Sequence, residues 1–196
     1  MVVEIVDHHL DVGGHSTVSG AQRNIAFDSE AKKALVGSAC TLVAEALVSN
    51  APGLVDSTLA TLLGGVILID TLNMDPAAAK GTARDGAALE SLEPMFPLAR
   101  AELFQRLVGA KFNPEWWASL SVGECLRYDY KQGESGGKVF GISAILLKIG
   151  DVTGKEAFAA AARAFIAERG LDTLVSGLVG GTPVLMLVLT LTLTGP

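Results

Sequence analysis

Residues 2–9 read Val2-Val3-Glu4-Ile5-Val6-Asp7-His8-His9, a β-branched run followed at once by three side chains able to bind a metal. A short run of this kind predicts a buried strand. Open α/β sheets place their active sites at the carboxyl ends of strands, where Asp7, His8 and His9 would stand. A neutral imidazole binds a divalent ion well, and a neighbouring His can hold an anion or relay a proton. The stretch therefore predicts an α/β fold with a polar site after its first strand. The alternatives are a polar turn or a tag remnant, and the absence of a poly-His run argues against the tag.

The composition is that of a folded acidic protein. The 196 residues are 49% hydrophobic and 18% charged, with a formal net charge of -6. That length allows one large or two small domains, and the apolar content is enough for a core. The negative charge argues against nonspecific binding to nucleic acid or to an anionic membrane, so a phosphate ligand would need a metal or a local basic cluster. Cys40 and Cys125 match no metal-binding spacing and are expected to be reduced core thiols. We expect no signal peptide and no membrane span, and hence a cytoplasmic protein.

The hydrophobic pattern predicts a mixture of helices and strands. Helices are expected at Ala39–Ser49 with Ser38 as N-cap, 56–63, Arg84–Leu92, Leu98–Val108, after Asn113-Pro114, and from Gly154 to Arg169. Strands are expected at Leu126–Gln132 and Lys138–Ile145, joined as a hairpin, and at Thr173–Val179 and Val184–Leu193. Residues 10–29 are expected to form a loop and Ala31–Leu35 a helical turn, whereas the run Val66–Ile69 is ambiguous between helix and strand. The segment Asp75–Pro97, rich in Ala, Gly, Pro and charge, predicts a linker between domains 1–94 and 95–196.

Two further polar clusters follow the His pair. Asp70 ends the apolar run and precedes Thr71; a carboxylate there is costly unless a cation or hydrogen bonds compensate it, although it could equally be a cap. Asp129-Tyr130-Lys131 begins the predicted hairpin, where alternation puts Asp129 and Lys131 on one face. The pattern alone favours a surface ion pair for these two residues.

Four motifs in order carry a resemblance to a known family. They are Val6-Asp7-His8-His9, the helix start Gly37–Val43, the stretch Leu62–Asn73 around Asp70, and Asp129-Tyr130-Lys131 after Leu126-Arg127. In this order they resemble the DHH phosphoesterase superfamily, and within it the prune-type exopolyphosphatases and manganese-dependent inorganic pyrophosphatases. The resemblance implies an α/β chain with the later part of a parallel-sheet DHH catalytic domain, followed by a smaller mixed α/β DHH-associated domain that binds substrate.

The resemblance also implies roles for single residues. His8 and Asp70 would bind one of the two divalent ions, Mn²⁺ or Mg²⁺, that the family uses. His9 would face the phosphate, and Asp7 would orient His8 as its hydrogen-bond partner. Lys131 would hold a phosphate as a point charge from the second domain. The implied activity is hydrolysis of phosphoanhydride bonds in pyrophosphate or short inorganic polyphosphate, in a cleft between the domains.

The sequence also departs from the family pattern. The family has aspartate motifs before the His pair, and a basic phosphate motif that is not found here after Lys155. We therefore expect a chain truncated at its N-terminus, with at most one partial metal site and impaired activity. One alternative is a catalytically inactive prune-like interaction protein that binds a protein partner or forms a homo-oligomer. Another is an oligonucleotide or nucleotide-bisphosphate phosphoesterase, which Asp129-Tyr130-Lys131 disfavours.

Overall fold

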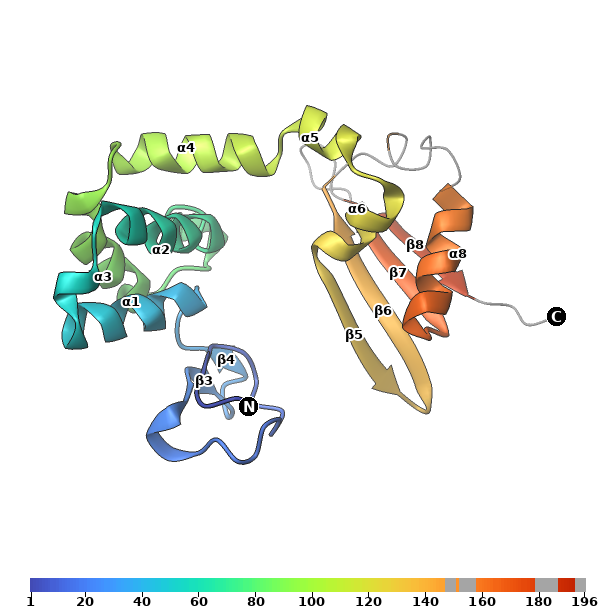
Figure 1. Cartoon of the computed structure of the whole chain (residues 1–196), viewed down its shortest axis with the longest axis horizontal. Helices are drawn as coiled ribbons and strands as arrows, with labels where there is room; N and C mark the ends of the chain where they lie inside the picture. Colours follow the sequence, from blue (N-terminus) through green and yellow to red (C-terminus); the bar gives the residue numbers. More distant parts are fainter. Residues whose placement is uncertain (147–150, 152–157, 179–186, 193–196) are drawn as a thin grey trace. The chain divides into compact units, whose positions relative to one another are not determined.

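The computed structural model describes residues 1–146, 151, 158–178 and 187–192 (Figure 1). The chain divides into two units, Met1–Lys111 and Phe112–Pro196. The sequence predicts two domains meeting at residues 94 and 95, whereas the division in the structure follows Lys111. What each unit contributes to function stays a prediction.

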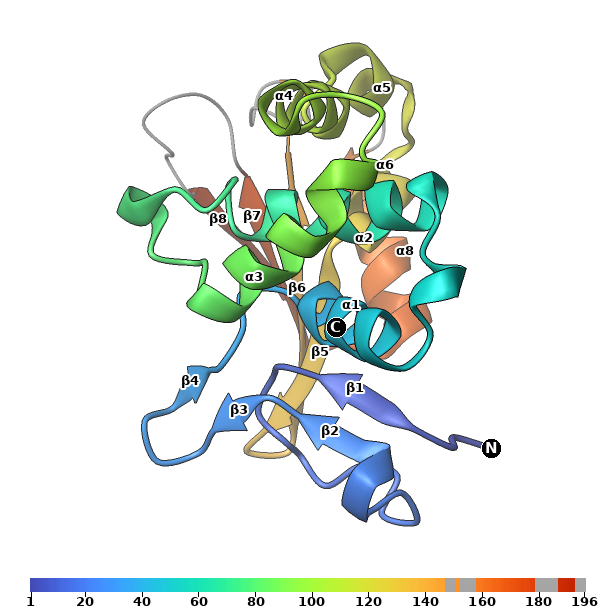
Figure 2. The same cartoon turned by 90° about the vertical axis from the view of Figure 1, so that its left-hand side faces the viewer.

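Two pairs of short strands begin the first unit (Figure 2). In chain order they are β1 (Ile5–Asp7), η1 (Gly20–Gln22, a 3-10 helix), β2 (Arg23–Ile25), β3 (Phe27–Asp28) and β4 (Lys33–Ala34). The strand predicted before His8 is present as β1, which pairs in parallel with β2. The loop predicted at residues 10–29 is present only as far as Ser19, and the helical turn predicted at Ala31–Leu35 is wrong. The Asp28 carboxylate accepts the backbone N–H groups of Glu30 and Ala31, and Lys32 has a positive φ of 54°, which turns the chain back as an antiparallel pair.

Helices make up the rest of the first unit. They are α1 (Ala39–Asn50), η2 (Pro52–Leu54), α2 (Ser57–Asp70), η3 (Pro76–Ala78), α3 (Ala83–Leu92), η4 (Glu93–Met95) and α4 (Arg100–Lys111). Ser38 caps α1 as predicted, since its side chain accepts the N–H of Cys40. The ambiguous run Val66–Ile69 is the end of α2, which passes through Gly64 and Gly65 without a break. A Cβ at Gly64 would lie 2.3 Å from the Phe96 ring, so this glycine is where a neighbouring side chain packs onto the helix.

The segment Asp75–Pro97 is not a linker in the structure. Its helix α3 buries Ala88, Leu89 and Leu92 in the same core cluster as Ile67 and Leu68 of α2. The Ala, Gly and charged residues of the segment suggested a linker, but Asp85, Ala88, Leu89 and Leu92 form a buried face of α3, while its other charged residues face solvent.

The second unit is a four-stranded sheet with helices. Its described elements are α5 (Pro114–Ser119), α6 (Val122–Tyr128), β5 (Tyr130–Ser135), β6 (Lys138–Ile145), α8 (Phe158–Arg169), β7 (Thr173–Leu178) and β8 (Leu187–Thr192). The sheet order is β5-β6-β7-β8; β6 and β7 are parallel and the outer pairs antiparallel. The predicted hairpin is confirmed, but its first strand begins at Tyr130, because a capping box between Ser121 and Glu124 starts α6. The expected helix start at Gly154 and the expected ends of the last strand fall on residues outside the described ones.

The α/β class predicted from the sequence is confirmed. In the second unit α8 lies against the sheet (Figure 1) and buries Phe158, Ala162, Phe165 and Ile166 with Leu174 of β7. Within the described residues no helix has the length and apolar character needed to cross a membrane.

Candidate functional site

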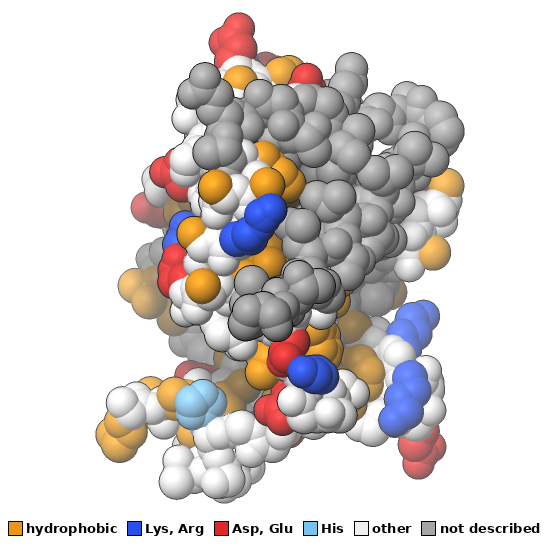
Figure 3. All heavy atoms as spheres, turned by 90° about the vertical axis from the view of Figure 1, so that its right-hand side faces the viewer, with side chains coloured by type: hydrophobic (Ala, Val, Ile, Leu, Met, Phe, Trp, Pro, Cys, Tyr) orange, Lys and Arg blue, Asp and Glu red, His pale blue; other side chains and the backbone are white. Residues whose placement is uncertain are grey.

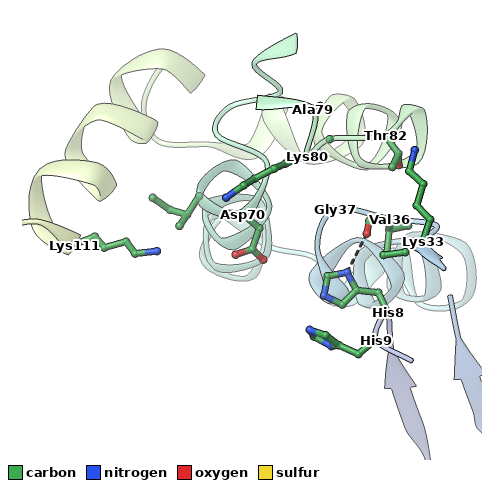
Figure 4. Close-up of a pocket in the computed structure, with 13 residues that line it drawn as sticks. His8, His9, Lys33, Val36, Gly37, Asp70, Ala79, Lys80, Thr82 and Lys111 are labelled. Atoms are coloured by element: carbon green, nitrogen blue, oxygen red, sulfur yellow. Dashed lines mark hydrogen bonds between the residues drawn. The ribbon is translucent and has the colours of Figure 1, made fainter. Parts of the chain in front are cut away.

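A cavity of about 600 Å³ in the first unit brings several predicted site residues together (Figure 4). His8 and His9 line it from the end of β1, and Asp70 lines it from the end of α2. In Figure 4 the His8 ring and the Asp70 carboxylate both point into this space. Residues more than sixty positions apart in the sequence therefore meet at one concave surface.

The His8 ring is fixed by the backbone. Its Nδ1 lies 2.9 Å from the carbonyl oxygen of Val36, a buried residue between β4 and α1. A carbonyl can only accept, so Nδ1 carries the proton and Nε2 keeps its lone pair. Metal-binding histidines are commonly held in this way, because a hydrogen bond from the ring nitrogen that does not bind the metal sets both the tautomer and the orientation of the ring. His8 is thus prepared to offer Nε2 to a cation.

Asp7 holds His9 rather than the ring of His8, which corrects the role implied by the resemblance. Its Oδ1 accepts from His9 Nδ1 at 2.7 Å and from the backbone N–H groups of His8 and His9 at 2.7 and 3.2 Å. Burial raises the pKa of Asp7, but these hydrogen bonds outweigh burial, and the pKa is lowered overall. Asp7 therefore stays a carboxylate near neutral pH and can accept from His9.

Asp7, His8 and His9 form a group of metal-competent side chains. Each offers one ligand atom, and these atoms all lie within 4.8 Å of one another. The two rings meet edge to face with centroids 4.5 Å apart. Asp70 is outside this group within the described residues, although it lines the same cavity. Whether His8 and Asp70 share one ion therefore stays a prediction.

Asp70 is the last residue of α2 and is exposed, so the cost of burial expected from the sequence does not arise. Its Oδ2 accepts a hydrogen bond of 2.6 Å from Ser38 Oγ. Ser38 is itself fully buried at the start of α1. Burial, and then the negative charge of Asp70, raise the pKa of the half-buried Cys40 thiol, and Cys40 and Cys125 are both free cysteines.

Asp85 is a structural centre that the sequence prediction missed. It is fully buried, and its carboxylate accepts from the N–H of Gly37 at 2.8 Å, the N–H of Ser38 at 3.2 Å and the hydroxyl of Thr41 at 2.6 Å. The backbone N–H and hydroxyl of Thr82 also donate to it, at 2.8 and 2.7 Å. Burial raises the pKa of Asp85, but the donors outweigh burial and lower the pKa overall. The available signal was the capping box Thr82-x-x-Asp85, which lay inside the supposed linker.

The connection Val36–Ser38 links Asp85 to both candidate ligands. The Val36 carbonyl holds His8, the Ser38 hydroxyl holds Asp70, and the N–H groups of Gly37 and Ser38 are bound by Asp85. A Cβ at Gly37 would lie 2.4 Å from the carbonyl oxygen of Lys80, so this connection passes too close to its neighbour for a side chain.

Lys131 lies in the second unit, on β5. Its Nζ is 2.6 Å from Asp129 Oδ1, and the two side chains are 72% and 53% exposed. Tyr130 points the other way and packs edge to face on Phe165. The structure therefore shows the surface ion pair that the pattern favoured, and a phosphate-binding role for Lys131 stays a prediction.

On the face drawn in Figure 3, the described acidic and basic side chains are interspersed.

No protein-family model matches the chain. Over 144 residues the chain is 37% identical to exopolyphosphatase PRUNE1 of Bos taurus and 35% identical to that of Homo sapiens, in each case covering 72% of this chain and 31% of the relative. With the Mus musculus protein it shares 38% identity over 117 residues. The chain spans about a third of the length of the curated relatives it matches.

The fold has a solved counterpart. A protein from Methanococcus jannaschii assigned as a family II inorganic pyrophosphatase superposes with a TM-score of 0.63, covering 90% of this chain and 57% of that one at 21% sequence identity. This likeness shows that the α/β architecture is shared. The sequence matches confirm the resemblance drawn from the four motifs, and the chain is similar to the prune-type exopolyphosphatases in sequence and to a family II inorganic pyrophosphatase in fold.

Proposed function

We propose that this chain carries part of a metal-dependent site that hydrolyses phosphoanhydride bonds in pyrophosphate or short inorganic polyphosphate. The observation that carries the proposal is that His8, His9 and Asp70 all line one cavity. The relatives named exopolyphosphatase and the neighbour named inorganic pyrophosphatase support the same reaction class.

The donor set fits a divalent ion. Nε2 of His8 is free of the Val36 hydrogen bond, and Asp70 has an oxygen beyond the one bound by Ser38. One imidazole nitrogen and carboxylate oxygens suit Mn²⁺, and the oxygens suit Mg²⁺. His8 and Asp70 would hold the ion, which when bound supplies Lewis-acid polarisation and a lowered pKa for attacking water.

The residues around the ion site have separate tasks in this proposal. Asp7 accepts from Nδ1 of His9, so a protonated His9 directs its Nε2–H away from Asp7 and toward the phosphoryl group. Water adds to phosphorus and loses a proton to solvent, the bridging P–O bond breaks, and His9 gives its proton to the leaving phosphate. Lys131 would add a positive charge for a phosphoryl oxygen.

The test is metal-dependent phosphate release from pyrophosphate and tripolyphosphate, comparing wild type with His9→Asn. His15→Asn is the matched control, because His15 lies in a loop outside the cavity and its positive φ of 52° is one that Asn tolerates. We expect low turnover that His9→Asn abolishes and His15→Asn leaves unchanged. Turnover that survives His9→Asn, or no metal-dependent release from wild type, would refute the proposal.

Metal binding gives a second measurement. Titration of the protein with Mn²⁺ should show an affinity at least about tenfold weaker in His8→Asn than in His15→Asn, because loss of an imidazole ligand removes a direct bond to the ion. Equal affinities would remove His8 from the ligand set.

A further inference from the structure

Three lysines from three separate elements line the same cavity. Lys33 comes from β4, Lys80 from the connection between η3 and α3, and Lys111 from the end of α4. Among the described residues that line the cavity, Asp70 is the only carboxylate. The cavity therefore concentrates positive charge in a protein whose net charge is -6.

The lysines lie on other sides of the cavity than the His pair. In Figure 4 the amines of Lys80 and Lys111 extend toward the space in front of Asp70, whereas Lys33 reaches toward Thr82. A ligand placed at the His8 and Asp70 side chains would thus meet ammonium groups in more than one direction.

Lys33 and Lys80 differ from two lysines of the second unit in their partners. Lys131 and Lys138 each pair with an aspartate, at 2.6 and 2.8 Å. Within the described residues neither Lys33 nor Lys80 forms such a pair with a carboxylate. Asp70 is the one described carboxylate that lines the cavity with these lysines, so positive charge exceeds negative charge there, and a bound anion would compensate the excess.

We propose that Lys33, Lys80 and Lys111 form an anion site for the phosphoryl groups of a linear polyphosphate that lie beyond the bond held at His8 and Asp70. The site rests on the proposed function for the position of the reacting bond. Three lysines carry more positive charge than a pyrophosphate bound to one divalent ion leaves uncompensated, so they match an anion with additional phosphoryl groups.

Size and chemistry agree with this ligand. A volume of about 600 Å³ is well within the range of small-molecule sites and exceeds the needs of a two-phosphate anion. Lysine is a point charge on a flexible stem, which suits successive tetrahedral phosphates more than one fixed planar group. Binding of this kind weakens as salt concentration rises.

The experiment measures binding of inorganic tripolyphosphate and pyrophosphate by calorimetry in metal-free buffer. The cavity variant is K33Q/K80Q, and the matched control is K32Q/K138Q, which removes the same charge from lysines that do not line the cavity. We expect the cavity variant to bind tripolyphosphate about tenfold more weakly, with a smaller loss for pyrophosphate. The control should bind as wild type does. K111Q, a single change at the end of a helix, repeats the test if the double variant does not fold.

An equal loss in both double variants, or no loss in the cavity variant and in K111Q, would overturn the lysine site. Phosphate release with Mn²⁺ distinguishes this outcome from failure of the proposed function. Lysine-dependent binding without turnover leaves the anion site in place and refutes the hydrolase. Turnover by wild type, with tripolyphosphate binding that does not depend on the lysines, supports the hydrolase and overturns the lysine site.

Discussion

Replacing Asp85 by Asn should loosen both candidate metal ligands from a distance. The side chain keeps its shape but loses its charge and gains an NH₂ group. If the amide oxygen takes the place of Oδ2, it keeps the donors from Gly37 and Thr82. The NH₂ group then faces the N–H of Ser38 and the hydroxyl of Thr41. The hydroxyl can rotate to accept, whereas the Ser38 N–H cannot, and one buried donor is left without a partner.

The size of the effect follows from those contacts. A buried donor without a partner costs about 1–3 kcal/mol, and the hydrogen bonds that remain lose their charge assistance. We therefore expect the first unit to lose about 2–4 kcal/mol of unfolding free energy, measured by urea titration with circular dichroism. Displacement of Gly37 and Ser38 would also disturb the bonds to His8 and Asp70. Mn²⁺ affinity should fall roughly tenfold or more, as is usual when partners of metal ligands are removed.

Asp75→Asn is the matched control for this change. Asp75 caps η3, the 3-10 helix that precedes α3, by accepting a single 2.9 Å hydrogen bond from the N–H of Ala77, and it is exposed. Asn is also a good cap, so this variant should lose less than about 0.5 kcal/mol and keep its Mn²⁺ affinity. If Asp85→Asn unfolds at the same urea concentration as Asp75→Asn and binds Mn²⁺ equally, Asp85 does not position the site.

Two further predictions concern pH and packing. Because the folded-state pKa of Asp85 lies below its ordinary value of 3.8, its contribution to stability is present above that value and is lost as the pH falls from there through the folded pKa. Wild type should therefore lose unfolding free energy more steeply than Asp85→Asn in acid titrations below about pH 4, and parallel curves would contradict this. Gly64→Ala should destabilise the first unit by about 1–3 kcal/mol, since its Cβ would lie 2.3 Å from the Phe96 ring. Gly53→Ala, where a Cβ meets nothing within 4 Å, should change the urea midpoint little; equal midpoints for the two variants would count against the Phe96 contact.

Local signals predicted much of the fold. The helix α1 with its Ser38 cap and strand β6 were predicted at or near their observed bounds, because a cap and an apolar alternation are visible within a few residues. The start of α6 was missed although its capping box between Ser121 and Glu124 is equally local. Strands β2 to β4 were missed because each has only two or three residues and depends on pairing with another segment.

The site was only partly predictable. His8, His9 and Asp70 were placed together by the order of motifs, and the cavity contains all three. Asp85 could not be found in this way, because three of its five donors, on Gly37, Ser38 and Thr41, are brought to it only by the tertiary fold. The partner of His8 was also assigned wrongly. The ring is held by the backbone carbonyl of Val36, and any residue at that position offers such a carbonyl.

The connection Val36–Ser38 would couple binding of the proposed ion to folding. The same three residues join β4 to α1, bind the buried Asp85, and hold His8 and Asp70. An unfolded chain keeps none of these bonds, so an ion that binds through His8 and Asp70 binds the folded first unit alone. Its binding free energy then adds to the stability of that unit and grows with the logarithm of the free ion concentration. The metal content of the surroundings would thus set how much of the first unit is folded, even before any substrate arrives.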